Sequence, residues 1–201
     1  MAARNAFSSS QRLGLQLAPE GLSIVQDVIN TAAIDAFDIP DLLVDADAAN
    51  RWAAEALGLW SERTGQPRWN LTLGPRDLTM LRRLRTDLRR WLLTGELSTL
   101  SVPAKDLTVG MEAGRPTYRP RGDGAAGLTA LISMELLLAT RSGTADRLRV
   151  CMNHECSAAF YDQSKNGSRV WHDVKACGNI ANLRASRARR RNATPGGGSK
   201  A

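Results

Sequence analysis

The side chains of this chain best suited to binding a soft metal ion lie in one short segment. All three cysteines and both histidines of the 201-residue sequence occur between positions 151 and 177. Four of them follow the pattern Cys151-x4-Cys156-x15-His172-x4-Cys177. Two close pairs separated by about fifteen residues are typical of small zinc modules, in which each pair comes from one turn. The pattern predicts one structural Zn2+ ion whose four ligand positions are all filled by the protein.

The segment allows other interpretations. His154 is the competing fourth ligand, but His172 pairs with Cys177 at the same x4 spacing and is therefore preferred. An odd number of cysteines argues against a disulfide framework and favours a reducing compartment. Buried reduced cysteines with incidental histidines would have to gather in one window by chance. A short module buries little surface without its metal, so metal binding should be coupled to folding.

The elements that must position these ligands can also be predicted. Apolar and polar residues alternate on both sides of Asn166-Gly167, which predicts a β-hairpin between the two ligand pairs. After His172, Asp173 is suited to cap a helix whose first turn carries Cys177. A knuckle, a hairpin and a helix that carries the last ligand describe a treble-clef-like zinc finger.

Positive charge is concentrated at the same end of the chain. Residues 1–150 hold 18 Lys+Arg against 17 Asp+Glu, whereas residues 151–191 hold 8 against 3. This asymmetry favours a polyanionic partner, most simply nucleic acid, although a solubilising tail has the same composition. The candidate nucleic-acid-binding residues lie at the tip of the predicted hairpin or on the last helix. At the tip they are Lys165 and Arg169, and on the helix they are Arg184, Arg187, Arg189, Arg190 and Arg191.

The preceding part of the chain reads as helical. Apolar residues at three- and four-residue steps predict helices over 22–37 and 74–95, and an apolar helix over 122–143 as the spine of the core. Asp45 or Asp47 is a natural N-cap for another helix, which should end near Gly58. Two short strands flank Glu112-Ala113-Gly114 and predict a small hairpin. The predicted fold class is mostly α (α+β). The sequence offers no uninterrupted run of 18 apolar residues, so we expect no membrane span.

The finger resembles a known family in specific residues. Its matching positions are Cys151-x4-Cys156, Phe160-Tyr161-Asp162, Ser164-Lys165-Asn166-Gly167-Ser168-Arg169, Trp171 and Cys177-Gly178-Asn179. These resemble the CGNR zinc finger, which in that family follows an N-terminal ABATE domain. Asp27-Val28-Ile29-Asn30-Thr31 is similar to the opening helix of that domain.

The resemblance implies the organisation of the chain and its function. We expect a flexible arm over 1–18, an ABATE-like helical domain over 19–145, a CGNR-type finger over 146–191 and a flexible tail over 192–201. The family is described as stress-induced bacterial transcription regulators, which implies a cytoplasmic, nucleoid-associated protein. Two positions depart from its pattern: His172 replaces the usual cysteine, and Ile180 replaces the signature arginine. Imidazole is a good zinc ligand, so a Cys3His site is expected. The missing arginine puts sequence-specific recognition in doubt.

Function is expected to lie in binding. The sequence has no P-loop, HExxH or GxSxG motif, and its histidines are confined to the finger, so no enzymatic activity is expected. The expected partner is double-stranded DNA, with no membrane association. An RNA- or ribosome-associated module is the alternative, because Phe160, Tyr161 and Trp171 could stack on bases. The N-terminal domain could sense a small-molecule effector or form a homodimer, although no heptad pattern supports dimerisation.

Overall fold

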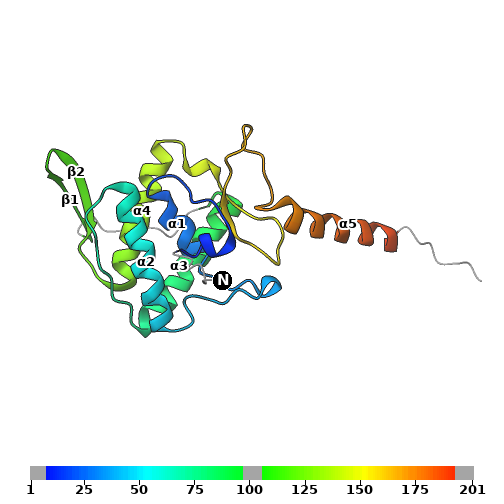
Figure 1. Cartoon of the computed structure of the whole chain (residues 1–201), viewed down its shortest axis with the longest axis horizontal. Helices are drawn as coiled ribbons and strands as arrows, with labels where there is room; N and C mark the ends of the chain where they lie inside the picture. The colour runs from blue at the N-terminus through cyan, green and yellow to red at the C-terminus, as the bar shows by residue number, and fades with distance from the viewer. Residues whose placement is uncertain (1–7, 97–105, 193–201) are drawn as a thin grey trace, which may run out of the picture.

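The computed structural model describes residues 8–96 and 106–192 (Figure 1). Residues 1–7 of the expected arm and 193–201 of the expected tail lie outside this range. The helices of the body are α1 (Leu22–Ile29), α2 (Ala46–Thr64), α3 (Pro75–Thr94) and α4 (Gly124–Arg141). Its hairpin is formed by β1 (Leu107–Glu112) and β2 (Arg115–Pro120). The finger contains β3 (Leu148–Val150), β4 (Ala159–Tyr161), a π-helical turn (Val174–Gly178) and α5 (Asn179–Asn192). The mostly helical α+β prediction is therefore confirmed.

The two clearest helices of the sequence form where expected. Pro75 opens α3, and Gly95 ends it with a φ of 76°, a conformation open to glycine at little cost. The stripe of leucines predicted for α3 faces the core and consists of Leu78, Leu81, Leu84 and Leu88. Asp123 caps α4, most of whose apolar side chains pack into the same core.

Two helix ends differ from prediction. The first helix ends at Ile29, with Asn30 as its C-cap, rather than at 37, because Asn30 and Thr31 turn the chain and Thr31 Oγ1 donates to the Val28 carbonyl. α2 runs through Gly58 and stops at Gly65, whose φ is 68°. Its Asp45 cap is confirmed, since the carboxylate accepts from the Ala48 N–H at 2.7 Å. Packing of Leu57 and Trp60 into the core, on either side of Gly58, outweighs the weak helix propensity of that glycine.

α1 lies at the centre of the body. All eight of its residues are buried, and it contacts α2, α3 and α4 (Figure 1). α4, which the sequence suggested as the spine, covers one side of it. By length and composition α4 is, among the described residues, the one helix that could cross a membrane. However, 56% of its apolar window is buried inside the protein, as is usual for a core helix.

The prediction of a loose arm is wrong for residues 8–18. The backbone N–H groups of Ser9 and Ser10 donate to the Asp27 carboxylate at 3.2 and 2.9 Å. Trp52 Nε1 donates to the same carboxylate at 3.0 Å. Asp27 is only 3% exposed, and a buried carboxylate needs such donors. The Asp27 carboxylate, which becomes buried when the chain folds, therefore holds this part of the arm against α1.

The start of α4 has the spacing G-x-G-x-x-G over residues 122–127. In nucleotide-binding folds this motif follows a buried parallel strand and leaves the helix N-terminus open to phosphate. Here it follows the antiparallel hairpin, and the Asp77 carboxylate accepts from the Ala125 N–H at 2.7 Å. A Cβ at Gly127 would meet the Trp69 ring and the Gly122 carbonyl. These glycines serve close packing in this protein.

Candidate metal centre

Four side chains converge within the finger: two from the turn after β3, one from the long loop and one from the π-helical turn. Cys151 directly follows β3, Cys156 ends the next turn, His172 follows a long loop, and Cys177 lies on the π-helical turn. Their ligand atoms all lie within 4.8 Å of one another. The three cysteines are buried and His172 is half-buried. This is the set that the sequence predicted as a zinc site.

The distances between these atoms suit a tetrahedral zinc ion. His172 Nδ1 lies 3.3 Å from Cys156 Sγ and 3.6 Å from Cys177 Sγ. Ligands at about 2.3 Å for sulfur and about 2.1 Å for nitrogen would be about 3.6 Å apart around a tetrahedral centre. His172 therefore presents Nδ1 to the site. Three thiolates and a neutral imidazole fill all four positions, which suits a structural ion and leaves no open position for substrate.

One of the three thiols, that of Cys151, favours the ionised form, whereas the pKa values of Cys156 and Cys177 are raised. The hydrogen bond from Cys156 lowers the pKa of the Cys151 thiol to about 4. The same contact raises the pKa of Cys156, so the pair readily holds one thiolate. Zinc would favour deprotonation of all three sulfurs, because only thiolates ligate the metal strongly.

The first ligand pair is positioned by a tight turn. The Cys151 N–H donates to the Ala158 carbonyl at 2.9 Å, which closes the turn across its base. The N–H groups of Cys156 and Ser157 both donate to the Asn153 carbonyl, at 2.8 and 2.9 Å. Ser157 takes a φ of 52° to let the chain turn back. The result is the knuckle expected from the x4 spacing.

The second pair is positioned by the turn that leads into α5. Asp173 accepts from the Ala176 N–H at 2.9 Å, which confirms it as the predicted cap. Its carbonyl accepts from both Cys177 and Gly178, and this widens the first turn into a π-helical one. A Cβ at Gly178 would lie 3.2 Å from the Trp171 ring, so glycine allows the close approach.

The predicted hairpin around Asn166-Gly167 forms only its turn. The Gly167 N–H donates to the Ser164 carbonyl at 3.2 Å, but β4 pairs with β3 and not with residues after the turn. The long loop is held instead by Asp162, which is fully buried and accepts from the N–H groups of Ser164 and Arg169 at 2.9 and 2.8 Å. These bonds outweigh the effect of burial and keep the pKa of Asp162 below its ordinary value.

Arg169, a candidate for nucleic-acid binding, makes contacts within the finger. Its Nη2 donates to the His172 carbonyl at 2.5 Å, and its guanidinium lies 5.5 Å from the centre of the Phe160 ring. Arg169 thus positions the loop that carries the histidine ligand. Phe160 is buried, which makes it part of the small core of the finger.

Four of the other basic candidates lie at the surface. Lys165 at the turn and Arg187, Arg189 and Arg190 on α5 are exposed. The side chains of Arg184 and Arg191 lie outside what the structure describes. Figure 1 shows α5 extending away from the body, and its first residue follows the candidate ligand Cys177 by two positions. Ile180, at the place of the family arginine, is half-buried in the first turn of α5.

His154 does not join the metal cluster. It is exposed and lines a cavity of about 580 Å3 between the knuckle and residues 33–36. Arg89 of α3 reaches the same cavity from the body. Burial lowers the pKa of Arg89, and the nearby Cys156 thiol opposes that shift. A centre of three thiolates and Zn2+ would carry one net negative charge, and Arg89 would offset it. In the sequence Arg89 was only one of several arginines on a helix.

The finger is joined to the body through Asn30. Its Nδ2 donates to the Ala159 carbonyl at 2.9 Å, and its Oδ1 accepts from the Ala159 N–H at 2.8 Å. Gln26 Nε2 donates to the same carbonyl at 3.2 Å. Asn30 thus satisfies both backbone groups of a residue in β4, 129 positions away. The sequence marked Asn30 by its family resemblance, but only the folded chain shows its partner.

Comparison with known proteins supports this assignment of the finger. Residues 147–190 match the family model of the CGNR zinc finger. No curated protein matches the chain. The ABATE name for the preceding domain is consistent with the family match. The chain therefore carries a CGNR zinc finger at residues 147–190, in which Cys151, Cys156, His172 and Cys177 fit one structural zinc ion.

Proposed function

We propose that this protein is a zinc-dependent DNA-binding protein that regulates transcription in the bacterial nucleoid. The proposal rests on the position of α5, which begins two residues after the last ligand, Cys177, and extends from the body. The sequence of α5, NIANLRASRARRRN, contains five arginines and no acidic residue. A zinc ion at the base of such a helix would fix its direction, so that its arginines meet the phosphates of a groove together.

The properties of the body support a separate, non-DNA-binding role for it. The body has a core of its own, and residues 1–150 are close to neutral. In this proposal the body senses an effector or forms a homodimer, and it has no catalytic role. The aromatic residues favour DNA over the RNA alternative, because Phe160 is buried and Tyr161 and Trp171 are half-buried in packing contacts. Base stacking requires exposed rings.

The salt dependence of DNA binding tests this proposal. The variant R187Q/R189Q/R190Q should bind duplex DNA more weakly. The negative slope of log K against log salt should become less steep by up to about three units. The control R83Q/R115Q/R119Q removes the same charge from exposed positions of the body and should leave the slope unchanged. Equal slopes for wild type and the α5 variant would contradict the proposal.

Competition with RNA separates the two nucleic acids. Enrichment of one motif from random duplex DNA, retained at higher salt, is expected for a regulator. Binding that is lost to an equal amount of single-stranded RNA would instead favour the RNA alternative.

A further inference from the structure

A second cavity in the body holds a buried carboxyl group that neither the zinc site nor DNA binding uses. The cavity has a volume of about 300 Å3 and lies where the start of α1, the end of α2, β2 and α4 meet. The residues that line it include Glu20, Gly21, Arg63, Tyr118, Glu135 and Leu138. Glu135 is only 3% exposed.

The two hydrogen bonds of the Glu135 side chain are made to the same carboxylate oxygen. Trp60 Nε1 and the Tyr118 hydroxyl both donate to Oε1, at 2.5 and 2.6 Å. The Oε2 atom lies against Gly21, where a Cβ would overlap the carboxylate. Because Gly21 has no side chain, Glu135 Oε2 can lie next to its backbone at the wall of the cavity.

The charges around the cavity are not balanced. None of the ion pairs formed by the described residues involves Glu135. Burial raises the pKa of Glu135, and the nearby Glu20 raises it further, while the two hydrogen bonds lower it. Arg63 faces the cavity, but its Nη2 donates to the Ala18 carbonyl at 2.8 Å. A buried carboxylate without a cation is costly, and a bound cation would remove that cost.

A purely structural role would not require a carboxylate at this position. The amide oxygen of glutamine could accept the same two hydrogen bonds from Trp60 and Tyr118. A carboxylate that keeps one oxygen at a cavity wall is suited to hold a positively charged group by charge-assisted hydrogen bonds. Tyr118 and Leu138 supply apolar surface beside it.

We propose that this cavity binds a small molecule that carries a primary ammonium group, held by Glu135 with Glu20 at the entrance and its alkyl part against Leu138 and Tyr118. The volume is at the lower end of the range for ligand pockets, which suits a small amine. This binding site is independent of the proposed DNA binding by the finger.

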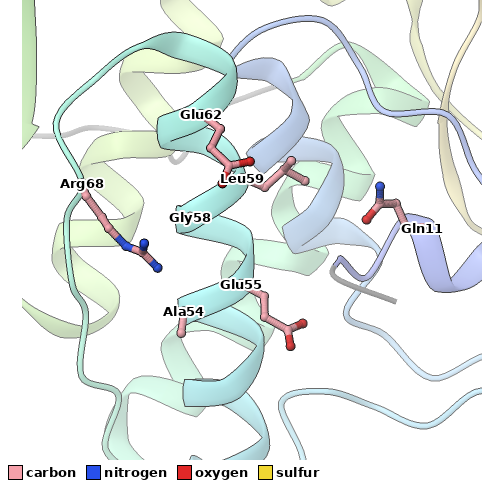
Figure 2. Close-up of a pocket in the computed structure, with 7 residues that line it drawn as sticks. All are labelled: Gln11, Ala54, Glu55, Gly58, Leu59, Glu62 and Arg68. Atoms are coloured by element: carbon pink, nitrogen blue, oxygen red, sulfur yellow. The ribbon is translucent and has the colours of Figure 1, made fainter. Parts of the chain in front are cut away.

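A larger hollow on α2 differs from the cavity at Glu135, because its charged side chains are exposed. It has a volume of about 470 Å3, and Figure 2 shows Glu55 and Glu62 on one side of it and Arg68 across from Gly58. These charged side chains are exposed, so water screens them and they need no ligand. Glu62 is therefore a matched control, because Glu62→Gln removes the same charge from the same region without changing the cavity at Glu135.

The test is an NMR or calorimetric titration of the full zinc-loaded protein with n-butylamine, 1-butanol and butyrate. The amine should bind wild type and Glu62→Gln equally, and Glu135→Gln at least about tenfold more weakly, because a charge-assisted hydrogen bond is lost. Butanol and butyrate should bind wild type more weakly than the amine. Equal amine affinity of Glu135→Gln and wild type, or butanol binding as tight as amine binding, would overturn the proposal.

A second variant covers the case in which Glu135→Gln does not fold. Glu20 is exposed, so Glu20→Gln is expected to fold and to weaken amine binding several-fold through the loss of one nearby charge. Amine affinity unchanged in Glu20→Gln, or absence of amine binding to wild type, would reject the site. None of these outcomes depends on whether α5 binds DNA.

Discussion

At the scale of single residues, the choice between the two histidines determines the metal site. His172 brings Nδ1 within 3.6 Å of two cysteine sulfurs, whereas His154 is exposed beside a cavity. The family position of His172 is usually cysteine, and both side chains ligate zinc well. Histidine in place of cysteine therefore keeps a closed four-ligand centre. The net charge of the centre with Zn2+ is then −1 instead of the −2 of a four-cysteine centre.

Substitution of His172 tests this assignment. His172→Cys should retain one zinc ion per chain, while His172→Ala should weaken zinc binding by more than about 100-fold, since loss of an outer-shell partner alone costs about 10–100-fold. Zinc content after gel filtration, measured by mass spectrometry, gives the answer. His154→Ala is the control and should keep its zinc; loss of zinc from that variant alone would show that the ligand is misassigned.

At the scale of elements, one side chain at the end of α1 holds a strand of the finger. Asn30 pairs with both backbone groups of Ala159, much as a neighbouring strand would. Asn50 of α2 makes an equivalent pair with Leu73, at 2.9 and 2.8 Å, within the body. The two asparagines thus perform the same task at different places, and this allows a matched comparison.

Asn30→Ala should leave the buried N–H of Ala159 without a partner and cost about 1–3 kcal/mol of stability. We expect faster amide hydrogen exchange at residues 158–162 with unchanged zinc content. Asn50→Ala should lower stability by a similar amount but leave exchange in the finger unaffected. Equal exchange at 158–162 in both variants would show that Asn30 does not hold the finger to the body.

At the scale of the whole molecule, the body and the finger have separate cores in contact. The finger core consists of Cys151, Cys156, Ala158, Phe160 and Cys177 together with Ile34 from the body. Half-buried residues from both parts pack against it, namely Leu13, Leu15, Ile39 and Trp171. The larger core is built mainly from α1 to α4 and also takes in Leu148 of β3 and Ala159 of β4. Loss of the metal should therefore affect the two parts unequally.

Removal of zinc by a chelator should increase hydrogen exchange over residues 151–178 and over the 34–39 turn, which packs on the finger core. Exchange in α2, α3 and α4 should stay slow, because their core does not include the metal site. Hydrogen exchange read by mass spectrometry would locate the change. Simultaneous loss of protection in α3 and α4 would contradict independent stability of the body.

The sequence by itself determined the features that depend on near neighbours. The ligand spacing, the Asp45 and Asp173 caps, the leucine stripe of α3 and the turn at Asn166-Gly167 all involve residues a few positions apart, where local geometry decides. The expected metal centre follows from such local pairs, and the structure brings them together as predicted.

Only the tertiary structure decided the features that depend on distant partners. The pairing of β4 with β3 and the burial of residues 8–10 each need a group beyond the near neighbours in the chain. The same holds for Asn30 on Ala159 and for Glu135 beside Gly21. A polar side chain gives no sign in the sequence of which distant group it will meet. Burial in the folded core makes that partner necessary, because an unpaired polar group there is costly.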